Sequence, residues 1–322
     1  GSLRPNNIRV QDLAQTPAQP ITPRKTLNLA LAVILGLLGG LALMVLQEQF
    51  DSSLKVPEDI EQDGRFVLLG YVPRIDGFHV KGKSKLQQRY QCMQLGPHSQ
   101  AAEVYRALRT SLLYAAPQGD ARAIVVTSPG AEEGKTTTVT NLGIALAQNG
   151  LKVLLVDGDL RKGRLHDVFQ LKRRPGLSEF LVGQATFEAI VQPTAIAGLS
   201  VVANGSAPPN PTELLGSTKM EEFLKQVTEQ FDRVLVDSPP AMAVADAAIL
   251  AGMTTSVVAV AQSGKTPQQA LYRLTAICNE VRAKMLGVVL NNVPKRDAPM
   301  YYRYSAYRYA APKDNHKAHV SS

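Results

Sequence analysis

A glycine-bearing loop followed by a lysine and two threonines is the first feature of the chain that could carry chemistry. The loop spans residues 128–134, and Lys135, Thr136 and Thr137 follow it. A helix that begins directly after such a loop points several backbone N–H groups at one spot, which favours a bound phosphate. Lys135 would add a positive charge for the β- and γ-phosphates, and the Thr136 hydroxyl would be a ligand for Mg²⁺. The pattern predicts a nucleotide site of the P-loop type.

The loop departs in one place from the standard P-loop pattern, G-x-x-x-x-G-K-[ST]. Its first glycine position is occupied by Pro129, and Gly130 follows one residue later. Taken alone, the loop could be an ordinary turn between a strand and a helix.

Three aspartates stand where two apolar strands are expected to end, and they weigh against that simpler explanation. Residues 154–156 precede Asp157 and Asp159, and residues 234–236 precede Asp237. In an open parallel sheet, ligands bind beyond the carboxyl ends of the strands, so these acids should converge on the loop. Loop and acids together predict a nucleotide site.

The elements that would position these residues alternate between strands and helices. A β-branched run at 124–126 predicts a buried parallel strand before the loop. A helix is expected from Thr212, as its N-cap, to about Gln230. Further helices and strands are then expected in alternation at 246–251, 256–260, 267–283 and 286–290. This order predicts an α/β fold whose parallel sheet is covered by helices on both faces.

A 20-residue apolar run, residues 27–46, precedes these elements, and Asn28 is its only polar side chain. A helix of this length matches the hydrocarbon core of a bilayer. A signal peptide fits poorly because the run is long and lacks a small-residue cleavage site. A buried core helix is the remaining alternative. The run therefore predicts one transmembrane helix.

Two arguments about the orientation of this helix conflict. Arg24 and Lys25 precede it, and residues 47–61 carry more acid than base, so the positive-inside rule places its N-terminal side in the cytoplasm. The nucleotide site, however, follows the helix and needs cytoplasmic ATP. We give the second argument more weight, because a further helix upstream of residue 1 could set the topology.

Composition sets broad limits. The chain has 322 residues, 45% hydrophobic and 19% charged, which is typical of a globular rather than a disordered protein. Cys92 and Cys278 lie far apart and suggest neither a disulfide framework nor a zinc site, consistent with a reducing compartment.

A charged triplet, Glu103, Arg106 and Arg109, has three-residue spacing and would share one face of a helix. Spacing alone does not distinguish an interface from a locally salt-bridged surface helix.

Half of the ten tyrosines lie in one polar segment: Tyr301, Tyr302, Tyr304, Tyr307 and Tyr309. Interleaved Arg303 and Arg308, with a net charge of +8, would suit stacking on nucleic acid. The cluster could instead be a docking patch, or a set of phosphoacceptors, each of which gains about −1.5 to −2 charges when phosphorylated. A terminal segment can reach an active site, its own or a neighbour's, which a core tyrosine cannot.

These motifs together resemble those of the bacterial tyrosine autokinases (BY-kinases) of the Wzc type, which are polysaccharide co-polymerases. The resemblance runs from about residue 20 to the tyrosine tail. It rests on SPGAEEGKTT (Walker A), LLVDGDLR (Walker A′), VLVDSPP (Walker B), EVYRALR and the tyrosine cluster. It implies a P-loop NTPase fold, MinD/ParA-like with a mostly parallel sheet, preceded by one transmembrane helix.

The resemblance also implies roles for single residues and two cofactors, ATP and Mg²⁺. The implied catalytic residues are Lys135, Asp157, Asp159 and Asp237, with Asp159 favoured as the base for the tyrosine hydroxyl. The implied metal-binding residues are Thr136, Asp157 and Asp237. The implied nucleotide contacts are Gly130, Ala131, Glu132, Glu133, Gly134, Lys135, Thr136 and Thr137, with Asn292 as an adenine contact.

The family further implies an assembly. Glu103, Arg106 and Arg109 would form the interface of a ring in which each tail is phosphorylated by the neighbouring subunit. The implied partners are the bacterial inner membrane, the polysaccharide export and polymerisation machinery and a cognate tyrosine phosphatase, but no nucleic acid. The implied domains are an extended extracytoplasmic segment at 1–26, the transmembrane helix at 27–46, a cytoplasmic linker at 47–97, the kinase domain at 98–295 and a flexible tail at 296–322.

A ParA/MinD-like ATPase switch, which shares the three Walker elements, is the main alternative. The apolar span and the five tyrosines count against it, and that family's signature lysine near the start of the loop is absent here. A scaffold without kinase activity is a third interpretation, against which the intact Lys135, Asp157, Asp159 and Asp237 argue.

Overall fold

The computed structural model describes residues 24–50, 52–75, 90–117 and 121–294. These belong to two compact units, residues 1–51 and 52–322, which are taken in turn. The described part of the first unit is the helix α1 (Lys25–Phe50). By length and composition, its stretch Lys25–Leu46 is long and apolar enough to cross a membrane. The helix expected at 27–46 is therefore present.

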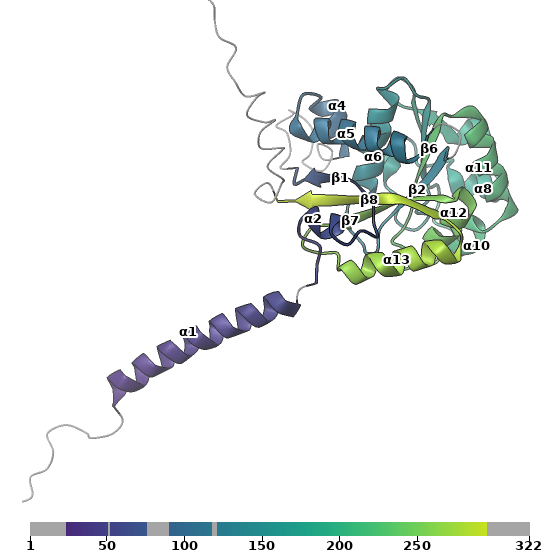
Figure 1. The fold of residues 1–322 in the computed structure, drawn as a ribbon. Coiled ribbons are helices and arrows are strands. Elements are labelled where there is room, and N and C mark those ends of the chain that lie inside the picture. The colour runs from purple at the N-terminus through teal and green to yellow at the C-terminus, as the bar shows by residue number, and fades with distance from the viewer. Residues whose placement is uncertain (1–23, 51, 76–89, 118–120, 295–322) are drawn as a thin grey trace, which may run out of the picture. The chain divides into compact units, whose positions relative to one another are not determined.

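The second unit is built on one eight-stranded sheet with the strand order β1-β8-β7-β2-β6-β3-β5-β4. Figure 1 labels β1, β8, β7, β2 and β6 of this sheet. All neighbouring strands pair in parallel except β4, which is antiparallel to β5. The strands are β1 (Leu68–Pro73), β2 (Ala123–Thr127), β3 (Val153–Asp157), β4 (Val191–Pro193), β5 (Leu199–Val202), β6 (Arg233–Asp237), β7 (Ser256–Gln262) and β8 (Lys284–Val293). The predicted P-loop α/β fold with a mostly parallel sheet is confirmed.

Helices cover both faces of this sheet, because its central strands are buried and apolar on both sides. One face packs against α4 (Cys92–Leu95), α5 (Gln100–Ala115), α6 (Lys135–Ala147) and α7 (Leu165–Phe169). The other packs against α2 (Glu58–Glu61), α8 (Leu177–Leu181), α9 (Phe187–Ile190), α10 (Pro211–Leu215), α11 (Thr218–Gln230), α12 (Asp246–Thr254) and α13 (Gln268–Glu280). Successive side chains of β3 point to opposite faces of the sheet. Leu154 and Val156 pack on the face covered by α11 and α12, and Val153 and Leu155 pack on the face covered by α5 and α6.

The single helix expected from Thr212 to Gln230 is wrong, because the chain forms two helices there. Gly216 ends α10, and the Ser217 side chain caps α11 by accepting a hydrogen bond from the backbone N–H of Met220. Thr212 lies inside α10 and donates its hydroxyl hydrogen to Asp246 at 2.6 Å. A glycine followed by a serine is a C-terminal and an N-terminal signal in succession.

The two edges of the sheet are formed by β1 and β4. β1 comes from the stretch expected as a linker, and it pairs in parallel with β8 at the opposite end of the chain. The short antiparallel β4 closes the other edge. The core of the second unit therefore includes residues on the N-terminal side of the P-loop, such as the buried Val72.

Replacing Phe223 by alanine should lower the free energy of unfolding by about 3–5 kcal/mol, because a large buried ring leaves a cavity. Phe223 is fully buried, with ring centroids 5.5 Å from Phe180 and 6.2 Å from Phe187. Urea unfolding followed by circular dichroism measures the loss. Tyr114→Ala is the matched control, because this ring is 83% exposed, and it should change stability by less than about 0.5 kcal/mol. Equal losses in both variants would contradict the assigned core.

Candidate active site

The glycine-bearing loop joins β2 to α6 at the carboxyl edge of the sheet. Gly134, the residue before α6, has a φ of 99°, in the left-handed region. A Cβ on this residue would lie 1.8 Å from the side-chain nitrogen of Asn291. Glycine is therefore required here both by backbone conformation and by space.

Lys135 is the first residue of α6, and its side chain turns back over the loop. Its amine donates a hydrogen bond to the Ser128 hydroxyl at 3.1 Å, and the residue is buried. Burial lowers the pKa of Lys135, while the negative charges of Asp237 and Glu133 raise it. A positive charge held in a partly desolvated loop interacts strongly with a phosphate, because nearby water screens it less.

Two aspartates lie side by side where β3 and β6 end. Asp157 is the register partner of Asp237 in the parallel pair, and both are buried. The Thr136 hydroxyl donates a hydrogen bond of 2.6 Å to Asp237 Oδ2, which links α6 to β6. Asp157 Oδ2 accepts the backbone N–H of Leu165 at 3.0 Å. The structure thus brings together three residues that sequence reasoning placed at one site.

Burial raises the pKa values of these two carboxyls. It raises the pKa of Asp237 to about 7, against the opposing effects of the Thr136 hydroxyl and the Lys135 charge. Burial, together with the negative charge of Asp237, also raises the pKa of Asp157 well above its usual range. Two acids that are costly to ionise side by side would both be stabilised by a cation.

The free oxygens of this pair fit a divalent cation. In the described part of the chain, Asp157 Oδ1 and Asp237 Oδ1 are buried and have no hydrogen-bond partner. Carboxylate and hydroxyl oxygens are the ligands that Mg²⁺ takes, and it commonly uses one or two carboxylates together with substrate phosphates. The candidate ligands are therefore two carboxylates and one hydroxyl, because no group of three His, Cys, Asp or Glu side chains that could hold a metal occurs among the described residues.

Asp159 differs from this pair in its surroundings. It is half-buried rather than buried, and its Oδ1 accepts the backbone N–H groups of Arg161 at 3.1 Å and Lys162 at 2.8 Å. A carboxylate with these properties can meet a hydroxyl that arrives from outside. Arg161 forms an ion pair with the buried Asp246, with 3.0 Å between Arg161 Nε and Asp246 Oδ2.

Several residues that hold the loop were missed by sequence reasoning. Asn291 donates its side-chain N–H to the Glu133 carbonyl at 2.9 Å, Lys265 donates to the Ala131 carbonyl at 2.8 Å, and Thr266 donates to the Glu133 carboxylate. Lys265 and Thr266 follow β7, Asn291 lies near the end of β8, and no local motif marks these residues. Asn292, expected as an adenine contact, is half-buried beside Asn291 with a φ of 59°.

The charged triplet lies on α5. Glu103 and Arg106 form an ion pair with each other, and Arg106 also donates to the Pro97 carbonyl at 2.6 Å. Arg109 donates a long hydrogen bond of 3.4 Å to the Ala145 carbonyl of α6. The five clustered tyrosines, Tyr301, Tyr302, Tyr304, Tyr307 and Tyr309, lie outside the described residues.

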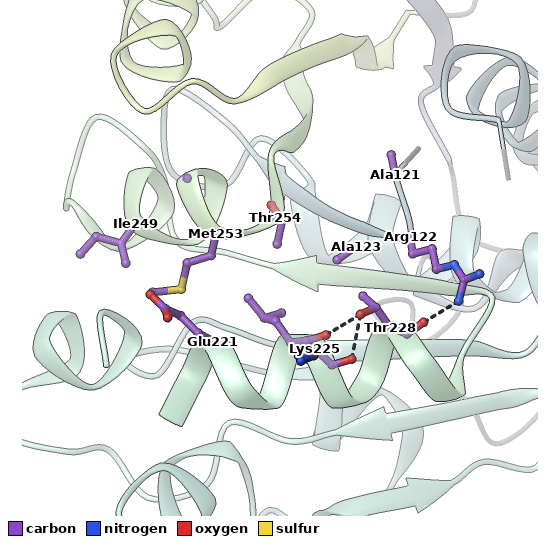
Figure 2. A pocket seen from close by; sticks show the side chains of 11 residues that line it. Ala121, Arg122, Ala123, Glu221, Lys225, Thr228, Ile249, Met253 and Thr254 are labelled. Atoms are coloured by element: carbon purple, nitrogen blue, oxygen red, sulfur yellow. Dashed lines mark hydrogen bonds between the residues drawn. The ribbon is translucent and has the colours of Figure 1, made fainter. Parts of the chain in front are cut away.

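A groove of about 690 Å³ opens at the other end of β2 (Figure 2). It is lined by Ala121, Arg122 and Ala123, at the start of β2, and by residues of α11 and α12 such as Lys225 and Met253. The P-loop leaves β2 at its carboxyl end, so this groove is separate from the candidate active site.

Comparisons with known proteins agree with this geometry. Residues 121–290 match the family model described as "AAA domain", and residues 2–49 match one described as "G-rich domain on putative tyrosine kinase". Of the solved structures, the BceF tyrosine kinase domain is 32% identical, with a TM-score of 0.66, and the match covers 75% of this chain and all of that domain. The chain belongs to the bacterial tyrosine kinase family.

Other members of the bacterial tyrosine kinase family match over similar lengths. The kinase domain of the Escherichia coli tyrosine kinase ETK is 29% identical with a TM-score of 0.68, over 77% of this chain and 98% of that domain. The tyrosine-protein kinase ptk of Acinetobacter johnsonii is 33% identical over 294 residues, which are 91% of this chain and 40% of that protein. The chain thus spans about two fifths of the curated relatives it matches.

The raised pKa of Asp237 predicts how stability depends on pH when no nucleotide is bound. An unfolded aspartate titrates near a pKa of about 3.9. The folded protein therefore holds more protons than the unfolded chain at intermediate pH, and its free energy of unfolding should fall as the pH rises from about 4 to about 7. Asp237→Asn cannot ionise, so it should be more stable than the parent at pH 8 by about 1–3 kcal/mol.

Thermal unfolding at pH 5 and pH 8 tests this prediction. Asp232→Asn is the matched control, because Asp232 is exposed and lies just before the same strand, and it should leave the pH dependence unchanged. The same fall in stability in the parent and in Asp237→Asn would show that Asp237 is not a buried ionised acid at pH 8.

Proposed function

We propose that this chain is the membrane-linked catalytic part of an ATP-dependent tyrosine autokinase. The observation that carries the proposal is the joint placement of Lys135 on the P-loop and of the Asp157–Asp237 pair, linked to the loop helix through Thr136. The membership of the chain in the bacterial tyrosine kinase family supports the reaction class.

Phosphoryl transfer depends on positioning and charge neutralisation, and the site supplies both. Lys135 and the amides of residues 130–137 would hold the phosphates of ATP. Thr136, Asp157 and Asp237 would hold Mg²⁺, which when bound neutralises charge on the phosphates. Asp159 would accept the proton of a tyrosine hydroxyl as the new bond between tyrosine oxygen and γ-phosphorus forms, the bond to the leaving oxygen breaks and ADP departs.

The acceptor in this proposal is the tyrosine cluster at 301–309 of a neighbouring subunit. Transfer between subunits requires a ring or another oligomer, for which Glu103, Arg106 and Arg109 on α5 are the proposed contacts. Each phosphate adds about −1.5 to −2 charges to the tail, so phosphorylation of several tails would weaken such an assembly.

The setting we propose is the bacterial inner membrane, spanned by α1 with the second unit in the cytoplasm. The apolar stretch Lys25–Leu46 and the requirement for ATP support this placement. Resemblance to the Wzc-type family supports a role in controlling capsule or exopolysaccharide polymerisation and export, with a cognate phosphatase that reverses the modification.

Incubation with Mg²⁺ and ATP, followed by mass mapping of residues 301–309, tests the activity directly. We expect phosphotyrosine in the parent, and in Lys135→Met a loss of at least about 100-fold, because one positive charge at the transferred phosphate is removed. Phosphotyrosine in Lys135→Met at the parental rate would place the kinase site elsewhere.

An ATPase control distinguishes the proposal from a ParA/MinD-like switch. Inorganic phosphate release is measured in the same reaction, with Lys162→Met as a matched variant because Lys162 is an exposed lysine that follows Asp159 by three residues. Lys162→Met should retain tail phosphorylation. Rapid ATP hydrolysis without any phosphotyrosine would favour the ATPase alternative.

A further inference from the structure

An acidic side chain inside the P-loop is held in place from outside the loop. Glu133 is buried, and its Oε2 accepts the backbone N–H of Gly130 at 2.8 Å. Its Oε1 accepts the hydroxyl hydrogen of Thr266 at 2.5 Å, and Thr266 is fully buried. A buried carboxylate needs both donors, because an unsatisfied charge is costly away from water.

Thr266 belongs to a stretch that we call the brace loop (residues 263–268), which follows β7 and ends with Gln268, the first residue of α13. The Thr266 hydroxyl also accepts the backbone N–H of Gln262 at 2.8 Å, so one oxygen fixes the brace loop and the P-loop together. Lys265 reaches the Ala131 carbonyl, and Asn291, which donates to the Glu133 carbonyl, accepts the Ser263 N–H at its own backbone oxygen. The P-loop therefore rests on the brace loop at several points.

The other side of the brace loop is paired with the residues that directly follow α1 in sequence. The N–H of Leu54 donates to the Thr266 carbonyl at 2.9 Å, and the N–H of Gly264 donates to the Leu54 carbonyl at 2.7 Å. The Ser263 hydroxyl donates to the Lys55 carbonyl at 2.6 Å, and the N–H of Gln268 donates to the Ser52 carbonyl at 3.1 Å. The Leu54 side chain is buried in the core layer that contains α13.

We propose that Thr266 is a positioning residue for the nucleotide site, and that it transmits the placement of residues 52–55 to the P-loop through Glu133. When these residues pair with the brace loop, the Thr266 hydroxyl faces Glu133 and the loop keeps its shape. When the pairing is lost, Glu133 loses a donor and the loop amides lose their alignment on the phosphates. The inference rests on the proposed function only in requiring that the P-loop binds a nucleotide.

The first test measures the affinity of the full chain for a fluorescent ADP by titration. Thr266→Val keeps the shape of the side chain but removes the hydroxyl, and it should weaken binding by about tenfold, the effect of one hydrogen bond to a buried charge. Thr266→Ser restores the hydroxyl and should bind within about twofold of the parent. Thr254→Val is the matched control, because its buried hydroxyl donates to the Leu250 carbonyl at 3.0 Å, in α12.

The second test asks whether residues 52–55 act through this hydroxyl. Leu54→Ala should weaken ADP binding several-fold in the parent and by less than about twofold when Thr266→Val is already present, because coupled residues are not additive. Ile60→Ala is the matched control, since Ile60 is equally buried in the same core layer but lies outside the pairing with the brace loop. It should lower the melting temperature as Leu54→Ala does and leave ADP affinity unchanged.

The outcomes separate this inference from the proposed function. Unchanged ADP affinity in a folded Thr266→Val chain would overturn the inference. The inference would also be overturned if Leu54→Ala weakened ADP binding by the same factor with and without Thr266→Val. If Thr266→Val does not fold, Glu133→Leu replaces it, because a leucine side chain can neither accept a hydrogen bond from the Thr266 hydroxyl nor donate one to it, and parental affinity in that variant would also overturn the inference. A chain that binds ADP as expected but forms no phosphotyrosine would remove the kinase proposal and leave this inference standing, whereas a parent that binds no nucleotide would overturn both.

Discussion

The burial of two neighbouring carboxyls is the constraint on which the rest of the site depends. Asp157 and Asp237 end adjacent parallel strands and are shielded from water, so ionising both is costly until positive charge arrives. Thr136 and Lys135 supply part of the compensation, and both come from the first turn of α6. The pairing of β3 with β6, the shape of the P-loop and the start of α6 therefore all have to be correct for the site to form.

The loop's shape in turn depends on contacts that reach far along the chain. Gly134 leaves room for Asn291, and Glu133 is held by Thr266, so the ends of β7 and β8 support a loop that follows β2. This arrangement is possible because β7 lies between β2 and β8 in the sheet. A loop supported in this way would need little reorganisation to bind a phosphate, which is the condition for strong electrostatic stabilisation.

Local patterns predicted the parts of the molecule that local physics controls. The apolar helix, the strand before the P-loop and the acids after β3 and β6 were all readable, because each depends on a short run of residues. The break at Gly216 was missed, since two short helices and one long helix share the same apolar period. The roles of Thr266 and Asn291 depend on strand order, which neither residue's neighbourhood encodes, and the antiparallel β4 is equally non-local.

The central claim is that this nucleotide site transfers phosphate to the tail of another copy of the chain. It is tested most directly by mixing two variants with Mg²⁺ and ATP. One is Lys135→Met, which retains the acceptors, and the other retains the site but has all five clustered tyrosines replaced by phenylalanine. We expect phosphotyrosine within residues 301–309 of the Lys135→Met chain, and only in the mixture. No phosphotyrosine on that chain, although its partner binds ATP, would contradict transfer between chains.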